Sequence, residues 1–181
     1  VQYQQAIQLN LENAKAYYYL GLAYQQQGQL EQAVAQYQQA IQLDSNYATA
    51  HNNLGLVYDE QGQLEQAIAQ YQQAIQLNPK HAAVHNNLGN AYAKQGQLEQ
   101  AVVQYQQAIQ LDPKATAIHN NLGNAYTKQG QLEQAIAQYQ QAIQLDPNYA
   151  AVHNNLGNAY TKRGQLEQAV VQYQQAIQLD P

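Results

Sequence analysis

The residues of this chain that could do chemistry recur at a fixed spacing of 34 positions. Asparagine fills one such column at Asn53, Asn87, Asn121 and Asn155, and its side-chain amide offers both hydrogen-bond donors and acceptors. A donor and an acceptor in each unit match the two-sided hydrogen-bonding needs of an extended peptide backbone. These amides could therefore bind a peptide; alternatively, they could simply hydrate an exposed face.

The asparagine column belongs to a longer polar stripe. In the unit that starts at residue 82, Asn86, Asn87, Asn90 and Lys94 have the spacing that places side chains on one side of a helix. Asparagine is a poorer helix former than glutamine, which the chain uses freely elsewhere, so its presence favours a function over hydration alone. We therefore expect a solvent-facing stripe that binds peptide. Its members in the other units include Asn52, Asn120, Asn154, Asn124, Asn158, Lys128 and Lys162.

Three lysines give this stripe a weak charge polarity. Lys94, Lys128 and Lys162 share one column, whereas the two preceding units hold Gln26 and Glu60 at that position. The lysines could direct an acidic segment of a ligand toward the last three units. They could equally be solvated side chains that complement the negative end of each helix dipole. Both interpretations stay open.

Aromatic residues distinguish the first unit. The His-Asn-Asn triplet of the later units is replaced there by three consecutive tyrosines, so Tyr18 and Tyr19 stand where the other units have asparagines. Tyrosine rings bury a large area and are enriched at protein interfaces. The two rings could anchor a ligand side chain, or they could pack against the partial hairpin that precedes them.

Other residue types do not assemble a catalytic or metal site. Histidine repeats at His51, His85, His119 and His153, but neighbouring helices lie about 10 Å apart, too far to share an ion through bonds of about 2 Å. The sequence has no recognisable nucleophile motif and no phosphate-binding glycine loop, and the glutamate of each unit opens a helix, where it complements the dipole. We therefore expect no enzyme activity, no metal and no cofactor.

The composition excludes several classes of partner. Hydrophobic residues make up 45% of the chain, enough for a continuous core, and charged residues only 10%. A net charge of -5 provides no positive field for phosphates, so we expect neither nucleic acid nor a membrane as partner. Cysteine is absent, and no apolar run reaches the roughly 20 residues that cross a bilayer. Because no leader opens the chain, we expect a soluble protein. Its location stays open, with the cytoplasm favoured.

Two columns of glycine residues define the length of the repeat. One column contains Gly89 and Gly123 and another contains Gly96 and Gly130, and both recur every 34 residues. The chain begins within a unit and without methionine, so we expect a fragment or a trimmed product. We expect a single array over residues 1–181, with units 14–47, 48–81, 82–115, 116–149 and 150–181, and with residues 1–13 as the tail of a sixth unit.

Each unit contains two helical patterns of apolar residues. In unit 82–115 the first pattern runs from Val84 to Gly96, a natural left-handed helix cap, and the second runs from Leu98 to the stop at Pro113. Helices of roughly 14 residues are marginal alone, so stacking must stabilise them.

Glycine also stands in the middle of the first helix of each unit, at Gly89 and Gly123 among others. A mid-helix glycine costs about 0.5 to 1 kcal/mol and therefore needs a packing reason. We expect the two helices of each unit to approach closely at these positions.

The unit from His85 to Pro113, HNNLGNAYAKQGQLEQAVVQYQQAIQLDP, resembles the tetratricopeptide repeat. Its pattern of Leu-Gly, Tyr, Gly, Ala, an aromatic residue, Ala and Pro recurs in phase over essentially the whole chain, although histidine replaces the usual Trp or Tyr and Ser45 replaces one proline. The resemblance implies an all-α fold, an α-solenoid of stacked antiparallel helix pairs that form a right-handed superhelix. It also implies a concave groove, lined by the first helices, that binds peptides.

Among relatives, the asparagine-lined groove most resembles the superhelix of the O-linked N-acetylglucosamine transferases, whose catalytic half is not present here. Another branch of the family binds chaperone tails through basic groove residues, but the positions expected to be basic hold Ala83 and Asn86, so such a ligand is not expected. We therefore expect a non-catalytic scaffold that binds a protein through a peptide segment. Two alternatives stay open: the recognition arm of a larger enzyme, and a designed or self-associating array that stacks end to end.

Overall fold

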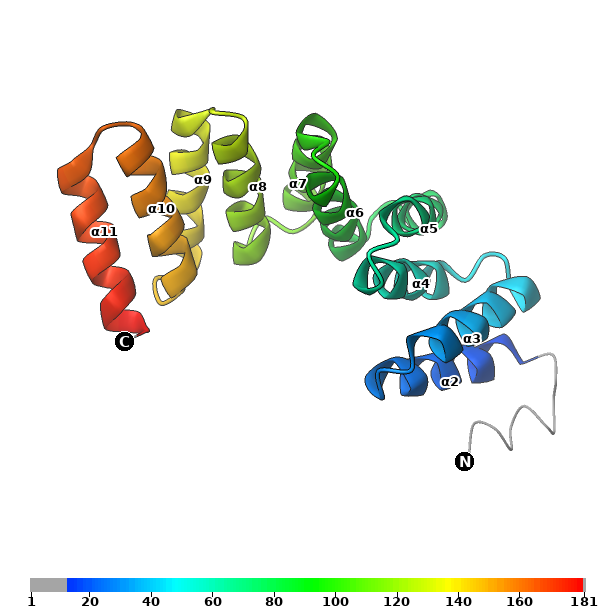
Figure 1. The fold of residues 1–181 in the computed structure, drawn as a ribbon. Coiled ribbons are helices and arrows are strands. Elements are labelled where there is room, and N and C mark those ends of the chain that lie inside the picture. The colour runs from blue at the N-terminus through cyan, green and yellow to red at the C-terminus, as the bar shows by residue number, and fades with distance from the viewer. Residues whose placement is uncertain (1–12, 181) are drawn as a thin grey trace. The chain divides into compact units, whose positions relative to one another are not determined.

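A computed structural model describes residues 13–180, and all regular structure in this range is α-helical (Figure 1). Helices of 13 and 14 residues alternate along it. The expected all-α fold of stacked helix pairs is confirmed; the tail predicted at residues 1–13 lies almost wholly outside the described residues. The helices are α2 (Ala14–Gln26), α3 (Leu30–Leu43), α4 (Ala48–Glu60), α5 (Leu64–Leu77), α6 (Ala82–Lys94), α7 (Leu98–Leu111), α8 (Thr116–Lys128), α9 (Leu132–Leu145), α10 (Ala150–Lys162) and α11 (Leu166–Leu179).

The chain divides into two compact units, and the first spans residues 1–91. It contains the hairpins α2–α3 and α4–α5 and most of α6. Three residues join the two helices of each hairpin, so the helices run antiparallel and pack along their length (Figure 1). α3 also packs on α4, which stacks the hairpins on one another. Tyr37, Val57 and Tyr71 are fully buried between these helices.

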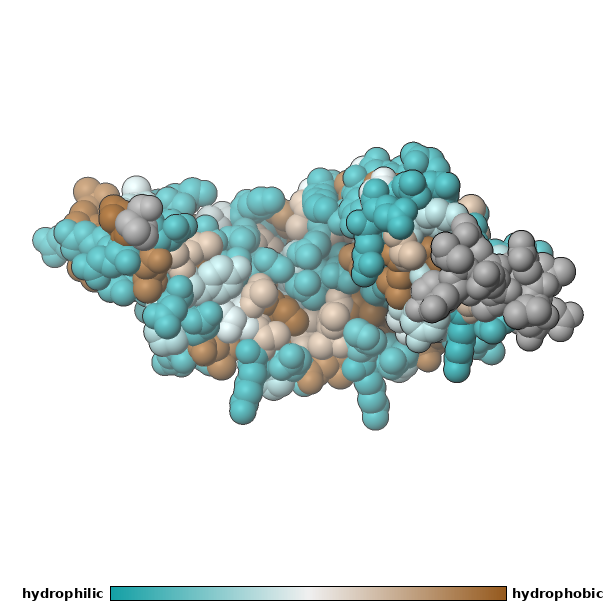
Figure 2. All heavy atoms as spheres, turned by 90° about the horizontal axis from the view of Figure 1, so that it is seen from below, coloured by the Kyte–Doolittle hydropathy of each residue, from teal (hydrophilic) through white to brown (hydrophobic). Residues whose placement is uncertain are grey.

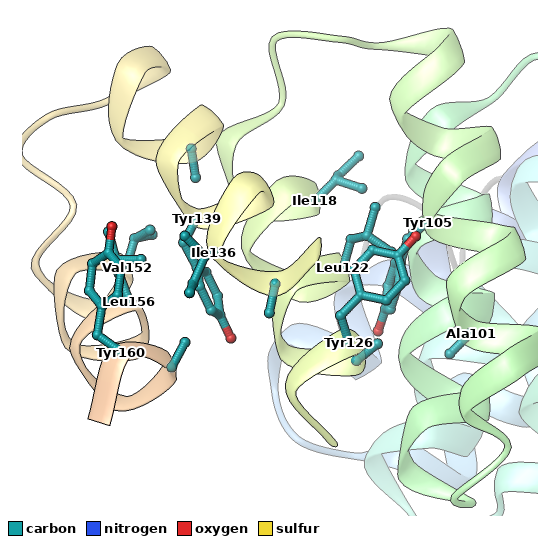
Figure 3. Packing of buried hydrophobic residues seen from close by; sticks show 14 of the residues in the cluster. Ala101, Tyr105, Ile118, Leu122, Tyr126, Ile136, Tyr139, Val152, Leu156 and Tyr160 are labelled. Carbon is teal, nitrogen blue, oxygen red and sulfur yellow. The ribbon is translucent and has the colours of Figure 1, made fainter. Parts of the chain in front are cut away.

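The second unit spans residues 92–181 and contains α7 and the hairpins α8–α9 and α10–α11. α7 packs on α8, and α9 packs on α10. Figure 3 shows the core that results: Leu122 and Tyr126 lie near Tyr105 on one side, and Tyr139 lies toward Val152 on the other. Burying an aliphatic or aromatic side chain contributes about 1.5 to 3 kcal/mol, so this shared core stabilises helices too short to be stable alone.

A glycine ends the first helix of each hairpin with a left-handed backbone. Gly96, the predicted cap, has φ of 78°, and Gly130 has φ of 75°. Other residues adopt this conformation at a cost of roughly 1 to 2 kcal/mol, which explains why the turns between paired helices contain glycine.

A second set of glycines lies where the two helices of a hairpin meet. A Cβ atom at Gly123 would lie 2.5 Å from Cε1 of Tyr139, and one at Gly55 would lie 2.7 Å from Cε1 of Tyr71. Gly21 and Gly157 meet the tyrosine of the next helix in the same way. The close approach predicted at Gly123 is therefore confirmed, and its physical cause is an aromatic ring seated against the glycine backbone.

One helix in the second unit exposes an apolar face. Four apolar side chains of α11 are 53 to 65% exposed: Leu166, Val170, Val171 and Ile177. Hydrophobic residues gather at the left end of Figure 2, where α11 lies. The sequence of α11 is identical to that of α7, whose apolar side packs on α8. Val102 and Ile109, the α7 counterparts of Val170 and Ile177, are half-buried against the core, whereas Val103, the counterpart of Val171, is exposed. Val170 and Ile177 thus occupy positions that the fold covers with a helix elsewhere. No helix among residues 13–180 is long and apolar enough to cross a membrane.

We expect molecules to self-associate through this face of α11 at high concentration. Changing Val170 and Ile177 together to glutamine should weaken association by about tenfold or more, because each aliphatic side chain contributes about 1.5 kcal/mol or more when buried. Light scattering over a concentration series measures the effect. Val103→Gln is the control, because Val103 is 50% exposed on α7. Equal association of the double variant and the parent would assign self-association to another surface.

Candidate functional site

The predicted asparagines of the first unit form a continuous chain of hydrogen bonds. Asn87 Nδ2 on α6 donates to Asn52 Oδ1 on α4 at 3.2 Å, and Asn52 Nδ2 donates to Asn53 Oδ1 at 3.1 Å. Asn53 Nδ2 then donates to the hydroxyl oxygen of Tyr18 on α2 at 3.2 Å. The amides therefore connect three successive first helices, and each retains further hydrogen-bonding capacity.

The same link occurs in the second unit. Asn155 Nδ2 on α10 donates to Asn120 Oδ1 on α8 at 2.8 Å. Asn120 is only 8% exposed, and Asn121 and Asn155 are half-buried, whereas Asn154 and Asn158 are exposed. The expectation of a stripe facing solvent throughout is therefore wrong, because asparagines of neighbouring repeats bond to one another and cover each other. Asn86, Asn90 and Asn121 also have partners.

In the second unit, tyrosines of the second helices form hydrogen bonds with Asn124 and Asn158. Tyr139 Oη donates to Asn124 Oδ1 at 2.8 Å and lies 3.0 Å from Thr127 Oγ1. Tyr173 makes the same contacts with Asn158, at 2.8 Å, and with Thr161, at 3.1 Å. Burial raises the pKa of Tyr139, although its hydrogen bond with Thr127 acts in the opposite direction. The hydroxyl therefore keeps its proton at neutral pH and acts as a donor.

These residues surround a hollow of about 450 Å³ in the second unit. The hollow brings together five of the predicted site residues from α8 and α10, including both lysines at the ends of these helices. Lys128 and Lys162 are exposed. The lining residues are Asn124, Thr127, Lys128, Tyr139, Asn155, Asn158, Thr161 and Lys162.

The α4–α5 hairpin of the first unit lacks this arrangement. Leu56 stands where α8 has Asn124, and Tyr71 Oη is buried with no hydrogen-bond partner. Burial, followed by the charges of Asp59 and Glu60, raises the pKa of Tyr71. In the preceding hairpin, Tyr37 Oη donates to the amide of Gln25 at 2.8 Å, and Gln25 Nε2 donates to Glu60 at 3.3 Å. In the column of Lys128 and Lys162, α2 thus has the neutral Gln26 and α4 has the acidic Glu60.

The two predicted aromatic residues differ in accessibility. The ring of Tyr18 packs among Tyr19, Tyr37 and Tyr47, with centroids 5.0 to 5.9 Å away. Tyr19 is 45% exposed. Tyr18 therefore packs between the first hairpin and the loop before α4, and Tyr19 is the more exposed of the two residues. The predicted alternative contact with the partial hairpin lies outside the described residues.

The histidine column has a structural role. Nε2 of His85, His119 and His153 lies 3.0 to 3.1 Å from the carbonyl oxygen of the proline six residues earlier, to which it donates. Nδ1 of His119 contacts the side chain of Gln138 on the next helix at 2.9 Å. The ring therefore fastens the start of a first helix to the preceding loop and to its paired helix. Within residues 13–180 no group of three or more His, Asp or Glu residues could hold a metal ion.

Sequence reasoning missed the residues that hold the site together. Thr127, Thr161, Tyr139 and Tyr173 were not predicted, nor was a second hollow of about 600 Å³ that is lined by glutamines, Pro113 and His119. One signal could have found the threonines: each immediately precedes a lysine of the polar stripe. No such signal marks the tyrosines, because their spacing predicts core residues.

These features define a class of protein: an array of helical hairpins whose first helices carry hydrogen-bonded polar side chains. The TPR repeat matches residues 1–28, 26–62, 57–96, 89–130 and 123–162, and the tetratricopeptide repeat matches residues 150–181. Together the matches extend over the whole chain, so the protein belongs to the tetratricopeptide repeat family. Arrays of this family are in general non-catalytic scaffolds that bind protein or peptide partners.

Solved structures share the fold. YrrB, described as a TPR protein with an unusual peptide-binding site, is 27% identical, with a TM-score of 0.84 over 99% of this chain and 92% of that chain. The PilF structure from Pseudomonas aeruginosa is 26% identical, with a TM-score of 0.82 over 93% and 77% of the two chains. MamA from Desulfovibrio magneticus RS-1, 22% identical with a TM-score of 0.87 over 92% and 94%, shows the fold alone. No curated protein matches the chain.

Proposed function

We propose that the chain is a non-catalytic scaffold that holds an extended peptide segment of a partner protein along its first helices. The observation that carries this proposal is the line of asparagine amides, fixed in orientation by bonds between repeats. An asparagine amide has two N–H donors and a carbonyl with two lone pairs, so one bond leaves several groups for a ligand. The related YrrB, which has a peptide-binding site, supports the same function.

Preorganised amides suit a ligand that is recognised through its backbone. Every peptide bond presents one N–H and one C=O, so contacts of this kind tolerate many sequences. A net hydrogen bond contributes roughly 0.5 to 1.5 kcal/mol, and four repeats that make one or two each supply several kcal/mol before association entropy is subtracted. We therefore expect affinities no tighter than about micromolar from the asparagine column alone.

Removing two members of the column tests the proposal. Peptides selected from a random library for binding to the chain should bind the Asn87→Ala, Asn121→Ala variant about tenfold more weakly, since several hydrogen bonds are lost. Calorimetric titration measures the affinity. Loss of the bond between Asn87 and Asn52 should cost no more than about 1.5 kcal/mol of stability, partly offset by the better helix propensity of alanine.

A matched control separates this effect from a general loss of amides. Asn46 and Asn148 are exposed in loops between hairpins, and changing both to alanine should leave peptide affinity within about twofold of the parent value. Circular dichroism checks that each variant is folded. Unchanged affinity in a folded Asn87→Ala, Asn121→Ala variant would remove the asparagine column from the mechanism.

A further inference from the structure

The second unit has another hollow, of about 600 Å³, that the proposed function does not use. Residues of α7, α8 and α9 line it, and α7 and α9 both pack on α8 without packing along each other. Its volume falls within the roughly 300 to 1,000 Å³ of pockets that bind ligands. Its lining residues on α8 are His119, Leu122 and Tyr126, on the side of the helix that faces away from Asn121 and Asn124. The hollow is therefore separate from the asparagine column.

Part of the lining is apolar. Leu122 is 3% exposed and Ile109 is half-buried, and Ala137 of α9 lies across from Ile109 of α7. Position 137 corresponds to Val103 of α7 and Val171 of α11, which are the bulkier valine. A valine at position 137 would place two further methyl groups in this space. The small side chain of Ala137 therefore helps to keep the hollow open.

Glutamine side chains provide most of the polar lining. Gln106 Nε2 on α7 donates to Tyr126 Oη at 3.0 Å, so this amide is fixed and its carbonyl oxygen is left as an acceptor. Gln110 of α7 and Gln141 of α9 are exposed, and their amides supply both donors and acceptors. None of the described residues that line the hollow is aspartate, glutamate, lysine or arginine. A charged group in the hollow would lose water without meeting an opposite charge, so the lining favours a neutral ligand.

We propose that this hollow binds the side chain of a tyrosine from a partner protein, at a place separate from the peptide-binding asparagines. The ring covers the apolar surface of Ile109 and Leu122, and the hydroxyl donates to the carbonyl oxygen of Gln106. The same hydroxyl accepts a proton from the NH₂ group of Gln110 or Gln141. Tyrosines in pockets are frequent anchors of protein interfaces, because one end of the side chain is apolar and the other is polar.

Other neutral side chains match the lining less well. Phenylalanine covers the apolar surface but removes water from the Gln106 carbonyl without replacing it by a donor. The indole N–H of tryptophan donates to that carbonyl but accepts nothing from the other amides. A serine hydroxyl does both but leaves the apolar surface uncovered.

Three capped tripeptides test the proposal on the folded chain. The probes are N-acetyl-Ala-Tyr-Ala-amide and its phenylalanine and serine analogues. Each is titrated while NMR follows the side-chain amide signals of Gln106 and the methyl signals of Leu122. We expect saturable shifts from the tyrosine probe. Binding of the phenylalanine probe should be about fivefold weaker for the loss of one hydrogen bond, and that of the serine probe about tenfold weaker or more for the loss of the ring.

A filled hollow tests the location of the probe. Ala137→Val should weaken binding of the tyrosine probe about tenfold, because the added methyl groups occupy part of its space. Ala69→Val is the control, since Ala69 is exposed at the corresponding position of α5 and does not line this hollow. The control should leave binding at Leu122 within about twofold of the parent value. An equal loss in both variants would mean that the probe binds elsewhere.

A second pair of variants tests the contact with the hydroxyl. Gln106→Leu removes the acceptor, so the preference for the tyrosine probe over the phenylalanine probe should fall from about fivefold to about twofold or less, as followed at Leu122. Gln140→Leu is the control, because Gln140 Nε2 donates to Tyr160 Oη at 3.1 Å and Gln140 does not line the hollow. Both variants lose an equivalent bond within the fold. An unchanged preference in Gln106→Leu would contradict the proposed contact.

Equal binding of the tyrosine and phenylalanine probes, or no saturable shift at Gln106 and Leu122, overturns the proposal. The Asn87→Ala, Asn121→Ala variant should bind the tyrosine probe within about twofold of the parent value, because neither asparagine lines the hollow. Tenfold weaker binding there would place the probe on the asparagine column and would also overturn the proposal. The proposed function is judged separately, by the affinity of the library peptides for that variant.

Discussion

Replacing Gly123 by leucine should lower the melting temperature of the chain by about 10 °C. A Cβ atom at this position would lie 2.5 Å from one ring carbon of Tyr139 and 2.9 Å from another, and the ring is too deeply buried to move away. Overpacking of this kind costs about 3 kcal/mol or more, and each kcal/mol lowers the melting temperature of a chain this long by about 2 to 4 °C.

Thermal melting followed by circular dichroism measures this effect. Ala117→Leu is the control, because Ala117 is exposed on the same helix and accepts the same side chain without a clash. A melting curve of Gly123→Leu within about a degree of the parent would show that the two helices do not meet at this glycine.

Truncating the partner ring, Tyr139→Ala, should destabilise the chain by about 3 to 5 kcal/mol, the usual cost of removing a buried aromatic side chain. The variant leaves a cavity beside Gly123 and removes the hydrogen bond to Asn124. Because the leucine of Gly123→Leu would then fill part of that cavity, the two changes should not add.

A double-mutant cycle measures this coupling. The Gly123→Leu, Tyr139→Ala chain should be more stable than the sum of the single effects by about 1 to 3 kcal/mol, as found for residues in contact. Chemical denaturation of the parent, both single variants and the double variant supplies the four free energies of unfolding. Strict additivity would contradict the contact.

Much of the fold could be predicted from the sequence because its signals are local and repeated. Apolar residues at helical spacing and the glycine at Gly96 define a helix and its end without reference to the rest of the chain. The close contact at Gly123 follows from the cost of glycine in a helix, which only packing can justify.

The site was predicted less completely, because its geometry depends on how repeats stack. Sequence spacing placed the asparagines on one side of each helix, but the bond between Asn155 and Asn120 joins residues 35 positions apart on different helices. No helical periodicity predicts such a pair. The role of Tyr139 was missed for a similar reason: its ring is a core residue, and only its hydroxyl reaches the polar side of α8.

The central claim, that a peptide lies along the first helices, is tested most directly by photocrosslinking. A library-selected peptide with a benzophenone side chain at its centre is irradiated with the chain, and mass spectrometry locates the attachment. Attachment to the polar side of α4, α8 or α10, near the asparagines of those helices, is the predicted result. Attachment to the exposed apolar face of α11, or to the second helices of the hairpins, would contradict it.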